Sequence, residues 1–191
     1  MKKSWTPEEI AKRTPPEIKH RFIIAFGRKF GMETLIETGT YAGETVEACL
    51  LYFSEIHSIE LSSYFYNLCC SKFYGNSKVH LYNGDSTEIL KTILPTIKSP
   101  ALFWLDAHYS GEKTAKGSLD CPILEELKAI TLLHPNSVLL IDDADLFPGY
   151  PGGWGEENPE WPNLDSLIFL ANTSNLYFEI QKAIICLIPK R

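Results

Sequence analysis

The chain has 191 residues, a length that suits one domain and leaves no room for two large ones. Hydrophobic residues make up 45% of it and charged residues 22%, which excludes a disordered chain and a coiled coil. The formal net charge is −6 at pH 7, from 24 acidic and 18 basic residues. Because a surface that binds nucleic acid is normally basic, nucleic acid is not expected as a partner.

The sequence shows no pattern of a membrane span or a signal peptide. Residues 1–20 carry charges and prolines where a signal peptide needs an apolar segment. The longest apolar runs, such as residues 183–189, fall well short of the roughly 20 residues that cross a bilayer. The five cysteines include no CxxC pair, which favours buried reduced thiols over a disulfide framework or a zinc site. We therefore predict a cytoplasmic protein without a membrane partner.

Residues 1–30 are predicted as an N-terminal helical extension. Pro15-Pro16 interrupts the segment, so two short helices are expected, and Gly31 ends the second. The extension is interpreted either as a lid or as a contact in a homodimer.

Residues 31–191 are predicted as one domain in which strands alternate with helices. The expected strands cover residues 34–38, 56–61, 79–85, 101–108 and 137–143, and the helices that follow them cover residues 44–55, 62–75, 86–94, 121–133 and 164–172. Two further strands, residues 176–181 and 183–189, close the chain.

The arrangement of these strands follows from their apolar pattern. The first, fourth and fifth are almost continuously apolar, as expected of central parallel strands covered by helices on both faces. The last two are too close in sequence for a crossover helix and should pair antiparallel. The fold class is therefore predicted as α/β, with a doubly wound, mostly parallel sheet.

Each of the five parallel strands is expected to end in at least one carboxylate. In an open α/β sheet, ligands bind outside the carboxyl ends of the strands. Mutual repulsion makes such a row of acids costly unless a ligand or a cation offsets it. The acids are Glu37, Glu60, Asp85, Asp106 and the pair Asp142-Asp143.

The turn after the first strand has the spacing G-x-x-x-G, from Gly39 to Gly43. It differs from the G-x-G-x-x-G of dinucleotide-binding proteins, and Glu37 just before it would repel a diphosphate. A ligand with a cationic amino or sulfonium group suits the turn better. A β-carbon at position 39 should collide with that ligand or force an unfavourable backbone angle. The alternative is that both glycines only shape the turn.

Two further strand ends suit a nucleoside. Glu60 is placed to accept hydrogen bonds from both ribose hydroxyls, and Asp85 with Ser86 to meet an adenine amino group. The alternatives are structural, because Glu60 could only favour a helix dipole and Asp85 could cap a helix.

The stretches ETGTYAGET, IHSIELS, NGDS, FWLDAHY and LLIDDAD resemble the successive motifs of class I S-adenosylmethionine-dependent methyltransferases. The resemblance covers residues 34–189 and implies a seven-stranded sheet with the last strand inserted antiparallel. It also implies S-adenosylmethionine as the cofactor of residues 31–191. The predicted cofactor-binding residues are Glu37, Thr38, Gly39, Tyr41, Gly43, Glu60, Asp85, Ser86 and Asp106. One departure is Thr40, where many members of the family have a second glycine.

Asp106, Asp142 and Asp143 end adjacent central strands, so their carboxylates should converge. Hard divalent cations with oxygen ligands neutralise such a cluster. The arrangement is similar to that of metal-dependent O-methyltransferases, in which acids at these strand ends hold magnesium, so the three are predicted as a Mg²⁺ site. The alternative is that one of the last two caps the next segment and Asp106 orients the methionine amino group.

Asp106 and His108 are the predicted catalytic residues. Methyl transfer to oxygen requires that a proton be removed near neutral pH, and His108 could serve as the general base. It could equally be a fourth metal ligand or an ordinary loop histidine.

Two loops, residues 109–120 and 147–163, are expected to shape the acceptor pocket. The second contains Phe147, Tyr150, Trp154 and Trp161, which suit stacking on a sugar or a planar ring. The alternative is that these rings cover the core.

The predicted function is methylation of a hydroxyl of a small molecule or sugar-like acceptor. A nicotinamide-dependent oxidoreductase and a non-catalytic, methyltransferase-like binding module are the competing hypotheses.

Overall fold

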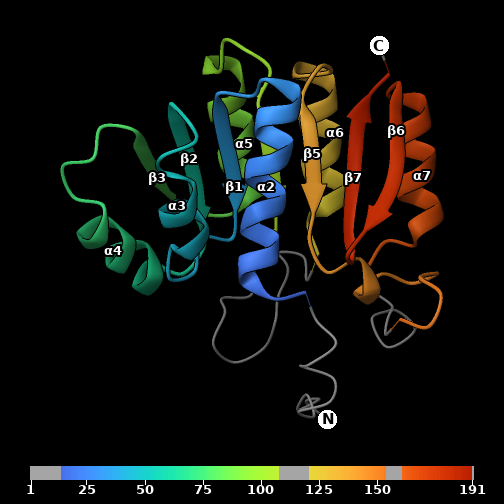
Figure 1. Cartoon of the computed structure of the whole chain (residues 1–191), viewed down its shortest axis with the longest axis horizontal. Coiled ribbons are helices and arrows are strands. Elements are labelled where there is room, and N and C mark those ends of the chain that lie inside the picture. Colours follow the sequence, from blue (N-terminus) through green and yellow to red (C-terminus); the bar gives the residue numbers. More distant parts are fainter. Residues whose placement is uncertain (1–13, 108–120, 154–160, 191) are drawn as a thin grey trace.

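The computed structural model describes residues 14–107, 121–153 and 161–190, which form a seven-stranded mixed sheet between two layers of helices (Figure 1). The strand order is β3-β2-β1-β4-β5-β7-β6. The strands are β1 (Thr34–Thr38), β2 (Glu55–Glu60), β3 (Val79–Asn83), β4 (Leu102–Leu105), β5 (Val138–Ile141), β6 (Leu176–Gln181) and β7 (Ile184–Pro189).

Two hydrophobic clusters fill the space between the sheet and the helices. One lies under α2 (Pro16–Phe30), α3 (Glu44–Cys49) and α4 (Ser63–Lys72). The other lies under α5 (Ser86–Ile93), α6 (Ile123–Leu133) and α7 (Leu164–Thr173). Two short 3-10 helices, η1 (Leu94–Thr96) and η2 (Ala144–Leu146), complete the described elements. Both faces of the sheet are therefore covered, as its apolar strands require.

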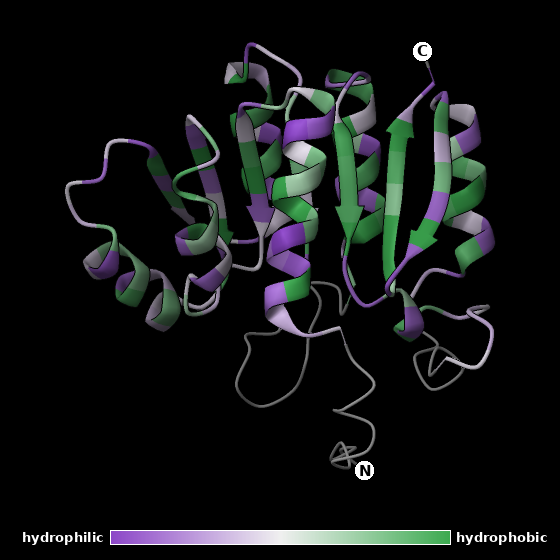
Figure 2. Ribbon diagram, in the orientation of Figure 1, coloured by the Kyte–Doolittle hydropathy of each residue, from purple (hydrophilic) through white to green (hydrophobic). Residues whose placement is uncertain are grey.

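The pairing of the strands confirms the predicted α/β fold. β1 pairs in parallel with β2 and β4, and β4 pairs in parallel with β5. β7 lies antiparallel between β5 and β6, which is the inserted last strand that the resemblance implies. The strands β5 and β7 are apolar along most of their length (Figure 2). Because β1 is followed by β2 on one side and has β4 on the other, the strand order reverses at β1, where such sheets bind ligands.

The first crossover helix is shorter than predicted. Residues 44–55 were expected to be helical, but α3 ends at Cys49. The amides of Ser54 and Glu55 already bond to the carbonyl oxygen of Glu33 at the start of β2, so the chain must leave the helix before them. Phe53 still packs in the core between the two elements.

The segment before Thr14 lies outside the described residues, and with it the first of the two predicted N-terminal helices. The second is α2, which begins at Pro16 and ends with Gly31 in a left-handed conformation. Among the described residues, no helix is both long and apolar enough to span a bilayer. All five cysteines are free thiols, four of them buried, and only Cys70 is half-buried.

Candidate functional site

The turn after β1 lies against the end of β4. Gly39 has a φ of +89°, and a β-carbon there would lie 2.3 Å from the carbonyl oxygen of Asp106. Its amide donates to the carbonyl oxygen of Ile59, at 2.9 Å. The left-handed backbone angle agrees with the sequence prediction. The described atoms that a β-carbon would meet are backbone atoms of β4's end, so this glycine is needed for the close approach of two strand ends.

A chain of hydrogen bonds links the ends of β1 and β2 beneath this turn. The Ser58 hydroxyl donates to Oε2 of Glu37 at 2.5 Å and lies 2.6 Å from the Thr40 hydroxyl. All three side chains are buried. Burial raises the pKa of Glu37 to about 7, although hydrogen bonds from Ser58 and Thr45 act in the opposite direction. At neutral pH this carboxyl group can therefore gain or lose a proton.

We expect the stability of the protein to fall as this carboxyl ionises. Its pKa is 4.5 in an ordinary environment and about 7 when folded, so its contribution to stability declines as pH rises through that interval. Glu37→Gln keeps an oxygen that can accept from Ser58 and removes the titration. Between pH 5 and pH 8, the wild type should lose about 2 kcal/mol more unfolding free energy than the variant. Urea unfolding at both pH values measures this, and parallel losses would contradict it.

Glu60 holds the same turn from the end of β2. Its Oε2 accepts the amide of Tyr41 at 2.8 Å, and its Oε1 accepts the amide of Ser62 at 2.7 Å. A carboxylate has about four acceptor positions, so the group retains capacity for two hydroxyl donors. The ring of Tyr41 is half exposed and packs on Phe65, with the ring centroids 4.3 Å apart. This geometry permits the predicted contact between Glu60 and the ribose hydroxyls, which stays a prediction.

Asp85 is the N-cap of α5. Its Oδ1 accepts both the amide of Thr87, at 3.0 Å, and the Thr87 hydroxyl, at 2.6 Å. The alternative interpretation of Asp85, that it caps a helix, is therefore confirmed. Ser86 is buried and is the first residue of that helix. Capping does not exclude the predicted adenine contact, which stays a prediction.

Three carboxylates converge at the ends of β4 and β5. One ligand oxygen from each of Asp106, Asp142 and Asp143 lies within 4.8 Å of the others. The amide of Asp106 bonds to the carbonyl oxygen of Thr38, and that of Asp142 to Leu105, so the neighbouring strands fix both positions. Burial and the nearby Asp143 raise the pKa of Asp106 to about 7, and burial also raises the pKa of Asp142.

The described cation at this cluster is Lys19, from the first half of α2. Its ammonium group contacts Oδ2 of Asp142 and lies 3.3 Å from Oδ1 of Asp143. Burial alone would lower the pKa of Lys19, but the three carboxylates outweigh that effect and raise it to about 12. Lys19 is not among the predicted site residues, because nothing in the local sequence pattern distinguishes it from other helix lysines.

Two further predicted residues lie at the ends of the turn after β1. Gly43 precedes α3 with a φ of +71°, and Thr38 is buried at the end of β1. Phe147 and Trp161 are buried and pack edge to face, with ring centroids 5.0 Å apart. These two rings are part of the core, so the expectation that they line the acceptor pocket is wrong for them. His108, Trp154 and the loop 109–120 lie outside the described residues.

Comparison with known proteins identifies the fold. Neither a protein-family model nor a curated protein matches the sequence. Among solved structures, the O-methyltransferase TomG from Streptomyces achromogenes, in complex with S-adenosylmethionine, is 16% identical with a TM-score of 0.67, over 93% of this chain and 82% of that one.

Two further structures are similar. The O-methyltransferase from Bacillus cereus, in complex with S-adenosylhomocysteine, is 13% identical with a TM-score of 0.63, over 93% of this chain and 83% of that one. The methyltransferase PaMTH1 from Podospora anserina, bound to S-adenosylhomocysteine, is 17% identical with a TM-score of 0.62, over 97% and 83%. The chain therefore has the fold of class I S-adenosylmethionine-dependent methyltransferases.

Proposed function

We propose that this protein is an S-adenosylmethionine-dependent methyltransferase that acts on a hydroxyl group of a small molecule. The observation that carries the proposal is the set of acids at the carboxyl edge of the sheet, where Glu37 and Glu60 lie in the last residues of β1 and β2 and Asp85 follows β3. A buried or nearly buried acidic edge suits a cofactor with cationic amino and sulfonium groups and opposes a diphosphate. The O-methyltransferases that share the fold support the reaction class.

Each group at the edge has a separate task in this proposal. Glu60 binds the ribose hydroxyls while its amide contacts hold the turn, and Asp85 faces the adenine. Asp106 lies next to Gly39, where it can orient the amino group of the methionine moiety. Bound there, the cofactor supplies an activated methyl group. Proximity and alignment then provide most of the rate, because transfer to oxygen needs little covalent help.

A proton must leave the acceptor hydroxyl during the transfer. We propose His108, two residues after Asp106, as the base that takes it. The residues Asp106, Asp142 and Asp143 offer the oxygen donors that Mg²⁺ prefers, and their spacing fits one ion. Such an ion would polarise the acceptor oxygen. For an ion to bind all three carboxylates, the Lys19 ammonium would have to withdraw from Asp142.

Transfer of labelled methyl groups tests the function. The full chain is incubated with S-adenosylmethionine labelled in the methyl group and with a panel of catechols, phenols and sugars. The proposal expects labelled methyl ethers and stoichiometric S-adenosylhomocysteine. Label on nitrogen or carbon would contradict oxygen as the acceptor atom. Binding of the cofactor without methyl transfer to any compound of the panel would favour a non-catalytic binding module.

Chelation tests the proposed metal in the same assay. EDTA should suppress turnover without displacing S-adenosylhomocysteine, and added Mg²⁺ should restore it. Full activity in EDTA would contradict a metal requirement, and Lys19 would then be the described counter-charge of the three acids.

A further inference from the structure

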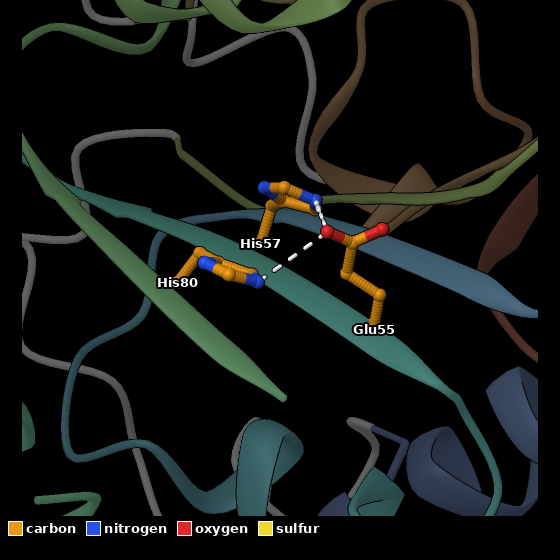
Figure 3. Close-up of side chains that lie close together, drawn as sticks. All are labelled: Glu55, His57 and His80. Atoms are coloured by element: carbon orange, nitrogen blue, oxygen red, sulfur yellow. Dashed lines mark ion pairs between the residues drawn. The ribbon is translucent and has the colours of Figure 1, made fainter. Parts of the chain in front are cut away.

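A second group of carboxylate and imidazole side chains lies near the amino ends of β2 and β3, away from the carboxyl edge, and Figure 3 shows its three members. Glu55 and His57 come from the start of β2 and, being two residues apart, lie on the same face. His80 on β3 is the register partner of His57. Oε1 of Glu55 lies 3.3 Å from Nε2 of His57 and 3.3 Å from Nε2 of His80.

This group is separate from the proposed cofactor site. Glu55 opens β2 and Glu60 ends it, so at a rise of about 3.3 Å per residue the two glutamates lie about 16 Å apart. Nothing in the proposed methyl transfer uses Glu55, His57 or His80.

His57 has a buried nitrogen that lacks a hydrogen bond. The residue is 4% exposed, and its Nε2 makes no hydrogen bond to the described residues; its 3.3 Å contact with Oε1 of Glu55 is an ion pair only when the ring is protonated. Its other ring nitrogen, Nδ1, lies 2.9 Å from the Tyr82 hydroxyl. The ring also stacks on His80, with the ring centroids 4.8 Å apart. When the ring is neutral, this buried nitrogen lacks a hydrogen bond, which destabilises a protein, and a bound ligand would supply the missing partner.

We propose that Glu55, His57 and His80 bind one divalent transition-metal ion of the zinc class, through Oε1 and the two Nε2 atoms. Imidazole nitrogens and a carboxylate oxygen are ligands that zinc prefers. In a tetrahedral site with bonds of about 2.0–2.1 Å, the ligand atoms are about 3.4 Å apart. The two separations of 3.3 Å are close to that value, and the stacked His80 ring would turn so that its Nε2 points at the same ion.

The surroundings of the three ligands support the same conclusion. The Tyr82 hydroxyl at Nδ1 can fix the orientation and tautomer of the His57 ring, as partners of metal-bound histidines commonly do. The side chains of Glu55 and His80 are 45% and 42% exposed, so they can adjust and leave a fourth position for water.

Titration with Co²⁺ tests this site. The full chain is titrated with CoCl₂ in excess Mg²⁺, because tetrahedral Co²⁺ bound by nitrogen absorbs far more strongly in the visible range than octahedral Co²⁺ bound by oxygen. We expect one equivalent with the strong bands and displacement by Zn²⁺. Loss of a partner that only orients a ligand costs about 10–100-fold in metal affinity, so Glu55→Gln and His80→Gln should each cost at least about tenfold.

The variants are chosen to keep the fold intact. His57 is buried and its substitution could unfold the chain, whereas Glu55 and His80 are partly exposed, and circular dichroism checks both variants. His134→Gln is the matched control, because its Nε2 lies 2.9 Å from the carbonyl oxygen of Leu94, away from the cluster. Absence of the strong bands in the wild type would overturn the proposal. Wild-type affinity for Co²⁺ in both Glu55→Gln and His80→Gln would also overturn it, and the three side chains would then form only ion pairs.

Discussion

Gly39→Ala is expected to abolish measurable binding of S-adenosylhomocysteine and to destabilise the protein. The added β-carbon would overlap the backbone of Asp106, with 2.3 Å to its carbonyl oxygen, and backbone atoms have no rotamer by which to move away. The left-handed backbone angle adds about 1–2 kcal/mol for any residue with a side chain. To relieve the overlap, the ends of β1 and β4 must separate, which displaces the proposed cofactor turn and Asp106 together.

Gly75→Ala is the matched control. Gly75 has a similar φ of +78°, but an added β-carbon meets no atom within 4 Å. It should cost only the backbone strain and leave affinity for S-adenosylhomocysteine unchanged. Calorimetric titration and thermal unfolding of both variants separate strain from overlap. Wild-type affinity in Gly39→Ala would mean that the turn does not face the ligand.

The second large effect is expected at Lys19. Its side chain is 18% exposed and that of Asp142 is 1% exposed, so Lys19→Met removes the described ammonium group that contacts the buried Asp142 carboxylate. Breaking a buried ion pair by removal of one partner costs about 3–5 kcal/mol. The loss should be larger at pH 8 than at pH 5, because protonation of the acids relieves the uncompensated charge.

Two further variants make this test specific. Lys91→Met removes an exposed pair with Glu88, and surface pairs of this kind contribute about 0–1 kcal/mol. Adding Asp142→Asn to Lys19→Met should recover part of the lost stability, because it removes the charge that Lys19 contacts. Urea unfolding gives the unfolding free energies of the wild type, the two single variants and the double variant. A loss no greater for Lys19→Met than for Lys91→Met would show that Lys19 does not balance the charge of the cluster.

The central sheet and its acidic edge could be predicted because both follow from local patterns. Continuous apolar runs identified β1, β4 and β5 as the central strands. A carboxylate lies at or directly after the end of each run. Since carboxyl ends of parallel strands meet at one edge, acids far apart in sequence could be placed together without knowledge of any contact.

What the sequence could not predict depends on contacts between distant elements. Lys19 meets Asp142 across 123 positions, and only the packing of α2 on the sheet brings them together. Glu55, His57 and His80 form a group only once β2 and β3 are paired in a particular register, which their own sequences do not specify. The need for glycine at position 39 likewise comes from the backbone of β4.

Calorimetric titration with S-adenosylhomocysteine tests the central claim, that the acidic edge of the sheet binds the methyl donor. The wild type should bind one equivalent, and NAD should give no heat. Glu60→Gln removes the negative charge, and the side-chain amide nitrogen cannot accept a hydrogen bond. The hydrogen bond from the backbone amide of either Tyr41 or Ser62 is therefore lost, and the affinity for S-adenosylhomocysteine should fall about tenfold or more. Glu55→Gln, at the other end of the same strand, should bind like the wild type. If S-adenosylhomocysteine did not bind to the wild type, or bound to Glu60→Gln with wild-type affinity, the account would be contradicted.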